Sequence, residues 1–104
     1  MSGGYVYLIS EDGDDSMYKI GVTRGSLESR LKKLQTGNGN RLSIVQSFYT
    51  DKPFKLEKML HNRFGINREE GEWFLMEKKD VDGFIDICEG YQRIIESLKD
   101  NPHF

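Results

Sequence analysis

The sequence contains little cysteine and no long apolar run, and both shortages exclude classes of protein. Cys88 is the single cysteine of the 104 residues, so neither an internal disulfide nor a cysteine-based zinc site can form. No stretch approaches the roughly 20 apolar residues of a membrane-spanning helix, and the N-terminus lacks the basic and apolar regions of a secretory signal. We therefore expect an intracellular, cytoplasmic protein with no membrane contact, in the host cell if the source is viral.

The length and the charge distribution predict one small domain with an anionic partner. A chain of 104 residues fits a single domain over residues 1–104, and its aromatic content of 12% supports a small core. The net charge is only -2, but residues 17–63 carry +7 and the remainder carries -9. The basic middle segment favours an anionic ligand such as nucleic acid. The alternative is that these lysines and arginines lie on solvated helix surfaces and pair with the acidic flanks.

The apolar pattern predicts an α+β fold in the order β-β-α-β-α-β-α. Residues rich in β-branched and aromatic side chains predict strands at 4–10, 17–23, 42–49 and 73–76, with an acidic loop at 11–16 closing a hairpin. Apolar residues at helical spacing predict helices at 26–36, 51–65 and about 80–100. Ser26 and Asp51 are the expected N-caps, and Cys88 falls on the apolar stripe of the last, long helix, as a core residue does.

Two charged residues fall close to apolar helix faces. On a helical wheel of the second helix, Glu57 lies within the arc of Phe54 and Phe64, with His61 one turn away on the same face. A carboxylate in that position needs a cation, a metal ion or hydrogen bonds, because burying it alone is costly. Arg30 borders the apolar face of the first helix, and a guanidinium binds phosphate or carboxylate with two parallel hydrogen bonds. The alternative for both residues is a structural ion pair, with each other or with a nearby charge.

Side chains in the first two strands complete the set of unusual residues. Tyr5 and Tyr7 share one face of the first strand, because side chains alternate along a strand, and two such tyrosines are most often core residues. Lys19 and Gly21 share a face of the second strand, and Tyr18 takes the other. A lysine between Tyr18 and an isoleucine is unusual, and its ordinary explanation is an exposed sheet face.

The residues singled out above, taken in their order along the chain, resemble the motifs of the GIY-YIG nuclease domain. Gly4-Tyr5-Val6-Tyr7 corresponds to the first motif, Lys19-Ile20-Gly21 to the second, and Arg30 and Glu57 follow on helices. Lys19 stands where the family has its second tyrosine. This variant, together with the segments 34–38, 56–61 and 71–74, is similar to a small phage and bacterial branch of the family. The resemblance covers about residues 4–76.

The resemblance implies a fold and a chemistry. The fold is a three-stranded antiparallel sheet flanked by helices, and the activity is metal-dependent hydrolysis of phosphodiester bonds in DNA. Tyr7 would act as general base, with its pKa lowered or its proton shared with the help of Lys19. Glu57 would hold one divalent ion, Mg²⁺ or Mn²⁺, while Arg30 clamps the scissile phosphate and His61 orients groups or assists proton transfer. Further residues would contact substrate or line the cleft: Tyr5, Gly21, Thr23, Asn38 and Glu72.

Two other hypotheses stay open at this stage. A module of the same fold could bind nucleic acid without turnover, in which case neither Glu57 nor a divalent ion is needed. A protein-interaction domain would use the acidic surface, and substitution of Arg30 would then leave nucleic-acid binding unchanged. Because the -9 flanks oppose phosphate contacts, we expect weak, salt-dependent DNA affinity or a targeting partner. The chain is expected to act as a monomer or a homodimer.

Overall fold

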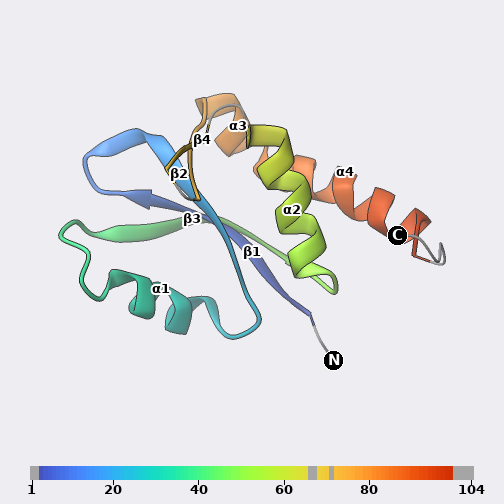
Figure 1. The fold of residues 1–104 in the computed structure, drawn as a ribbon, viewed down its shortest axis with the longest axis horizontal. Helices are drawn as coiled ribbons and strands as arrows, with labels where there is room; N and C mark the ends of the chain where they lie inside the picture. Colours follow the sequence, from blue (N-terminus) through green and yellow to red (C-terminus); the bar gives the residue numbers. More distant parts are fainter. Residues whose placement is uncertain (1–2, 66–67, 71, 100–104) are drawn as a thin grey trace.

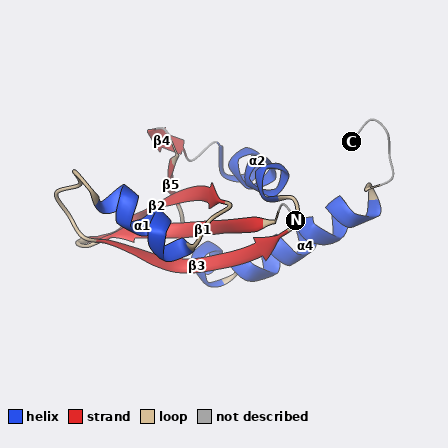
Figure 2. Cartoon of the chain, turned by 90° about the horizontal axis from the view of Figure 1, so that it is seen from below, coloured by secondary structure: helices blue, strands red, loops and turns tan. Residues whose placement is uncertain are grey.

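The computed structural model describes residues 3–65, 68–70 and 72–99, which form one antiparallel sheet with helices on both faces (Figures 1 and 2). The strand order is β3-β1-β2-β5-β4. The elements are β1 (Gly4–Glu11), β2 (Asp14–Thr23), α1 (Leu27–Gln35), β3 (Leu42–Thr50), α2 (Pro53–Phe64), β4 (Arg68–Glu70), β5 (Trp73–Leu75), α3 (Lys78–Asp82) and α4 (Phe84–Ser97).

The sheet confirms the α+β class but is wider than the expected three strands. β3, β1 and β2 form the predicted centre, and β1 lies between its two partners along most of its length. The additional width comes from β5, which pairs with β2 only over Met17–Lys19, and from β4 beyond it. A strand edge with unpaired N–H and C=O groups attracts such a partner. β5 stops early, and therefore the second half of β2 stays open at its edge.

The first two strands are joined by a tighter turn than the expected loop over residues 11–16. β1 runs to Glu11 and β2 begins at Asp14, so only Asp12 and Gly13 form the turn. Gly13 has φ of 88°, a conformation that suits glycine because it has no Cβ. The Asp14 carboxylate accepts hydrogen bonds from the backbone N–H of Ser16 at 2.9 Å and of Met17 at 3.1 Å. The acidic residues therefore stabilise the start of a strand.

The helix boundaries agree with the sequence except at two points. Ser26 is the N-cap of α1, as predicted, and accepts a hydrogen bond from the backbone N–H of Ser29 at 3.1 Å. Asp51 is not the cap of α2: the cap position belongs to Lys52, and Pro53 opens the helix. The last helix is broken at Gly83, whose φ of -92° and ψ of 7° are not helical, so α3 and α4 replace the single helix expected over 80–100. Residues 100–104 lie outside the described residues.

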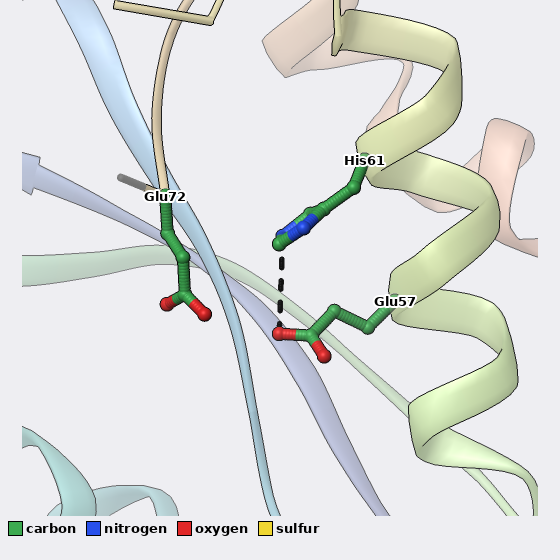
Figure 3. Close-up of side chains that lie close together, drawn as sticks. All are labelled: Glu57, His61 and Glu72. Carbon is green, nitrogen blue, oxygen red and sulfur yellow. Dashed lines mark ion pairs between the residues drawn. The ribbon is translucent and has the colours of Figure 1, made fainter. Parts of the chain in front are cut away.

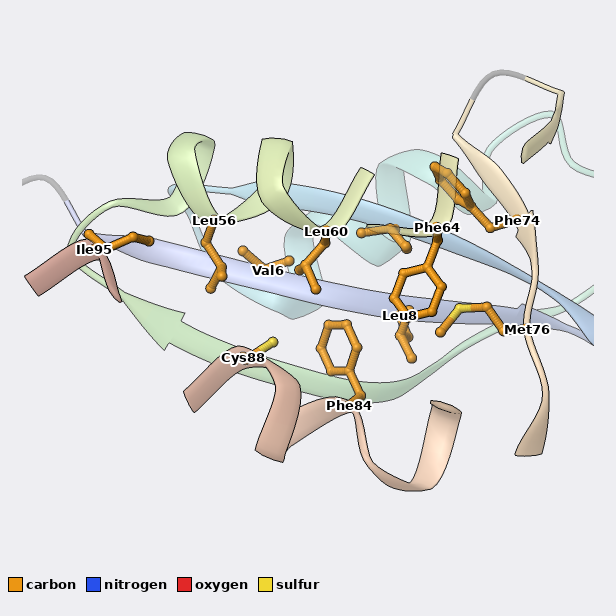
Figure 4. Close-up of a cluster of buried hydrophobic side chains, with 11 residues drawn as sticks. Val6, Leu8, Leu56, Leu60, Phe64, Phe74, Met76, Phe84, Cys88 and Ile95 are labelled. Atoms are coloured by element: carbon orange, nitrogen blue, oxygen red, sulfur yellow. The ribbon is translucent and has the colours of Figure 1, made fainter. Parts of the chain in front are cut away.

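Most of the core lies on one face of the sheet. Side chains from β1 and β2 meet α2 and α4 there, and Cys88 is fully buried as predicted (Figure 4). Burial raises the pKa of its thiol to about 12, so the group behaves as an apolar side chain. On the opposite face α1 packs with half-buried leucines over Tyr7 and Ile9. Among the described helices, none combines the length and the apolar character that crossing a bilayer requires.

Candidate active site

Tyr7 is the centre of the site, and the glycine opposite it explains how its ring fits. Tyr7 is fully buried on the α1 face of β1, directly across from Gly21 of β2. A Cβ at Gly21 would stand 2.5 Å from the Tyr7 hydroxyl, so the ring lies across the glycine. The Arg30 Nε of α1 donates a hydrogen bond to this hydroxyl at 3.1 Å. Because Gly21 has no side chain, the ring of Tyr7 can lie across β2 at this position.

Of the two ways in which Tyr7 could become a base, a lowered pKa or a shared proton, the first is not what its surroundings produce. Burial raises the pKa of Tyr7 above its ordinary value, while the hydrogen bond and positive charge of Arg30 oppose this rise. The carboxylates of Glu72 and Glu57 add to it, because negative charges disfavour a phenolate. The hydroxyl therefore carries its proton in this state of the chain, and it accepts from Arg30 through a lone pair.

His61 completes the edge of β2 where β5 stops. The backbone N–H of Ile20 donates to the carbonyl of Glu72 at 3.1 Å, which is the last bond in that direction to the β5 segment. The carbonyl of Ile20 instead lies 3.0 Å from His61 Nε2. Because a carbonyl only accepts, Nε2 carries the proton of this hydrogen bond. This contact holds the ring of His61 against the edge of β2.

Glu57 lies at the edge of the buried stripe of α2, not in its middle. The buried residues of this helix are Pro53, Leu56, Leu60 and Phe64. Phe54, which the wheel placed on the apolar face, is 53% exposed. The stripe is therefore centred further from Glu57 than the wheel suggested, and only 15% of the Glu57 side chain is exposed. Burial raises the pKa of Glu57, and the nearby charge of His61 opposes this effect.

Glu72 is the residue of this site whose role the sequence left undecided. Its carboxylate pairs with Lys19 Nζ at 3.1 Å, and the same ammonium lies 6.0 Å from the centroid of the Trp73 ring. Lys19 and Tyr18 point to opposite faces, as expected, because Tyr18 packs with the α4 side of the core. The register of β5 against β2, which places Trp73 opposite Lys19, is what brings Glu72 here. The apolar residues that begin at Trp73 predicted a strand next to Glu72. They did not indicate that this strand would pair with β2.

Three ligand-type side chains converge at this edge (Figure 3). Glu57, His61 and Glu72 each offer one atom, and these atoms lie within 4.8 Å of one another. Oxygens on opposite sides of Mg²⁺ are about 4.2 Å apart, since each Mg–O bond is about 2.1 Å. Carboxylate oxygens are ligands that Mg²⁺ and Mn²⁺ prefer, so this group of side chains could hold a divalent ion. The His61–Glu57 ion pair, at 3.8 Å between Nε2 and Oε2, is the direct contact within the group.

Arg30 faces this cluster from α1 without binding it directly. Among the ion pairs of the described residues, none joins Arg30 to Glu57. The structure therefore does not support the alternative of a structural ion pair between these two residues. The negative charges of Glu72 and Glu57 still favour the guanidinium, after the larger effect of the Tyr7 hydrogen bond, and together they raise the pKa of Arg30. A cation, a phenol and two carboxylates thus share one small region.

The remaining expected residues lie at varying distances from this cluster. Tyr5 lies across from Thr23 on β2 and packs edge-on against Tyr49, with ring centroids 5.3 Å apart. The Thr23 hydroxyl accepts a hydrogen bond from the Gly25 N–H at 3.2 Å. Both residues are two positions from the Tyr7–Gly21 pair, so they border the site.

Asn38 is the one expected residue that the structure directs elsewhere. Its side-chain amide donates to Glu11 Oε2 at 3.1 Å and to the carbonyl of Asn40 at 2.6 Å. Glu11 is four residues beyond Tyr7, at the far end of β1. Asn38 therefore orders the loop after α1 at that end of the sheet and contacts no member of the cluster. Gly71, which adjoins Glu72, lies outside the described residues.

Comparisons with known proteins give one match. The model of the T5orf172 domain matches residues 4–89, which include every residue of the cluster described above. No curated protein matches, and neither does any solved structure. The matched range covers most of the sequence, from the first residue of β1 into α4. The chain belongs to the T5orf172 domain family.

Proposed function

We propose that this chain is a metal-dependent endonuclease of GIY-YIG type that hydrolyses phosphodiester bonds in DNA. The family to which it belongs is associated with GIY-YIG-like domains, which agrees with the motif order in the sequence. The observation that carries the proposal is the hydrogen bond of 3.1 Å between Arg30 and Tyr7 beside the carboxylates of Glu57 and Glu72. A base, an anion-binding cation and metal ligands are the groups that metal-dependent phosphodiester hydrolysis uses.

The chain's own residues divide the work as follows. Arg30 binds a non-bridging oxygen of the scissile phosphate and stabilises the charge that grows there. Glu57 holds the divalent ion, with Glu72 as the facing carboxylate. When bound, Mg²⁺ or Mn²⁺ supplies Lewis-acid stabilisation of the phosphate and the leaving oxygen. His61 donates to the carbonyl of Ile20 and keeps Glu57 and the strand edge in register.

Tyr7 first releases its hydroxyl proton to solvent, and the resulting phenolate positions the attacking water and accepts the proton of that water. A neutral phenol cannot take a proton without first losing one, so the phenolate is the active form in this role. Arg30 favours the phenolate by charge and by hydrogen bonding. Lys19, whose ammonium lies 3.1 Å from Glu72, supplies positive charge near the position that the family's second tyrosine occupies.

A plasmid-nicking assay tests the proposal. The parent is incubated at low salt with Mg²⁺, with Mn²⁺ and with EDTA, beside Glu57→Ala and the control Glu89→Ala, which changes an exposed glutamate of α4. We expect nicking by the parent and by Glu89→Ala only when metal is present, and none by Glu57→Ala. Nicking by Glu57→Ala at the parental rate would refute the assignment of Glu57.

The raised pKa of Tyr7 favours a second candidate, a module that binds nucleic acid without cutting it. In that case the phenol stays neutral and serves with Arg30 as a hydrogen-bonding pair for phosphate. The same assay separates the two functions. DNA binding in EDTA, without nicking under any metal condition and with equal affinity for Glu57→Ala, would select the binding module.

A further inference from the structure

Phe54 is a large apolar side chain that neither the core nor the proposed chemistry uses. It is 53% exposed, although Pro53 and Leu56 of the same helix are buried. Residues separated by three or by seven positions share a helix face, so Phe54 lies on the face of α2 that carries Glu57 and His61. Three residues, about 4.5 Å along the helix axis, separate Phe54 from Glu57. The exposed ring therefore borders the candidate active site.

Positive charge surrounds this ring. The Arg24 guanidinium lies 5.0 Å from the centroid of Phe54, close enough for a cation–π interaction. Arg24 follows directly after β2, three residues beyond Gly21, and Phe54 lies on α2. This surface therefore adjoins β2 and α2, two elements that also contribute to the candidate site. A shallow cavity of about 230 Å³ lies here, lined by Arg24, Asp51, Lys52, Pro53, Phe54 and Lys55.

The one carboxylate of the cavity is engaged with residues of the C-terminal segment. Asp51 Oδ2 lies 3.6 Å from Lys99 Nζ, and Asp51 Oδ1 accepts a hydrogen bond from Gln92 at 3.5 Å. The lining of the cavity therefore holds three cationic side chains, Arg24, Lys52 and Lys55, and one carboxylate, Asp51. This is a local excess of positive charge in a chain whose net charge is -2. Its charge is complementary to a phosphate.

We infer that this surface, the Phe54 patch (Arg24, Lys52, Phe54 and Lys55), binds an unpaired nucleotide of the strand that is cleaved at the neighbouring site. An exposed aromatic ring stacks on the face of a base, and flanking cations bind the phosphate of the same nucleotide. Within a continuous duplex the faces of each base are covered by its neighbours in the stack. A single-stranded or branched region exposes them. The inference rests on the proposed function for the position of the cleaved bond.

The patch then gives the site a preference for a substrate class. Single-stranded and branched DNA should bind more tightly than blunt duplex, since only an unpaired nucleotide can use both the ring and the cations. Phosphate contacts alone would serve both kinds of DNA. Phe54 therefore carries the difference between the two substrates, while Arg24, Lys52 and Lys55 contribute to both.

The test measures binding in EDTA, where no cleavage occurs. Fluorescence anisotropy compares a short single-stranded oligonucleotide with a blunt duplex of the same sequence, for the parent, Phe54→Ala, Phe54→Trp and the control Ile94→Ala. Ile94 is an exposed apolar residue of α4, 45% exposed. Loss of one stacked base costs about tenfold or more in Kd. We expect that loss for Phe54→Ala on the single strand with little change on duplex, and near-parental affinity for Phe54→Trp and Ile94→Ala.

A second readout guards against a merely structural effect. The tryptophan of Phe54→Trp should be quenched by the single strand beyond the parental signal of Trp73, because a stacked base quenches indole emission. Thermal denaturation of Phe54→Ala should match the parent, since the ring is exposed. The inference falls if Phe54→Ala binds the single strand as the parent does, if the parent prefers duplex, or if it binds neither. Loss of binding in Phe54→Ala without any metal-dependent nicking would instead refute the nuclease function and retain the patch.

Discussion

The two faces of the sheet differ in how much apolar surface they bury. On the α2 and α4 face, buried side chains from both strands and helices form one continuous cluster (Figure 4). On the α1 face, the buried apolar cluster of the described residues consists of Tyr7, Ile9 and Leu42, and α1 itself has no buried residue. The second face instead holds the Tyr7–Arg30 hydrogen bond and borders the carboxylates at the β2 edge. Most of the buried apolar surface therefore lies on one face, while the candidate site lies on the other face and at the β2 edge, where α2 contributes Glu57 and His61.

This separation has a physical reason. A site that binds phosphate and a metal ion needs charged groups that keep some contact with water, and such groups gain little by burial. α1 supplies Arg30 from a helix whose leucines are only half-buried. The helix can therefore adjust to a ligand without disturbing the main core. The predictions below test this contrast.

The largest effect is expected in the main core. Phe84→Ala removes a fully buried aromatic ring and should lower the free energy of unfolding by about 3–5 kcal/mol. Leu31→Ala, on the half-buried α1 face, should cost only about 1 kcal/mol, because much less surface is returned to water. Urea denaturation of both variants measures the contrast. Equal losses would show that the two faces share one core.

The second largest effect is expected for the cleavage rate when Arg30 of α1 is replaced. Arg30→Ala should lower the cleavage rate by about 10²–10³-fold, as for loss of a donor to a developing charge, with little change in Tm. Because Arg30 opposes the rise of the Tyr7 pKa, its removal should raise that pKa further. The cleavage rate should then increase only at a higher pH than in the parent. A pH–rate series from neutral to alkaline pH measures both quantities. A parental rate would leave Arg30 a structural role only.

Gly21→Ala tests the packing of Tyr7 at intermediate cost. The new Cβ would stand 2.5 Å from the Tyr7 hydroxyl and 2.6 Å from its ring carbon Cζ. Moving the ring costs about 1–3 kcal/mol in stability and displaces the hydroxyl from Arg30. Gly39→Ala is the matched control, since nothing lies within 4 Å of a Cβ there. Thermal denaturation and the nicking assay should show losses for Gly21→Ala alone.

The smallest effect is a gain in stability at Glu57, the proposed metal ligand. Burial raises the pKa of Glu57 in the folded chain above its unfolded value, so its protonated form favours folding and its charged form opposes it. That contribution is present below the unfolded pKa and is lost as pH rises through the folded one. Glu57→Gln should therefore stabilise the fold at pH 7 by on the order of 0.5 kcal/mol while abolishing cleavage. The gain should vanish near pH 4, which denaturant titrations at the two pH values would detect.

Local sequence signals predicted the elements better than their edges. Ser26 could be recognised as a cap because its hydroxyl needs only the N–H three residues later. Asp51, which the sequence predicted as a cap, instead has partners outside its own segment. Asp51 is engaged by Lys99 and Gln92, which a local pattern does not contain.

The residues of the site were predicted in kind but not in their arrangement. The sequence by itself determined the α+β class and the charged residues beside apolar helix faces, because these follow from residue spacing. The roles expected for Tyr7 and Gly21 came from the resemblance to a known family. Only the tertiary structure decided that Glu72 meets Glu57, that His61 completes the edge of β2, and that Phe54 faces outward. Each of these depends on where β5 stops and how α2 lies across the sheet. Such long-range packing is a property of the whole chain, and no local pattern specifies it.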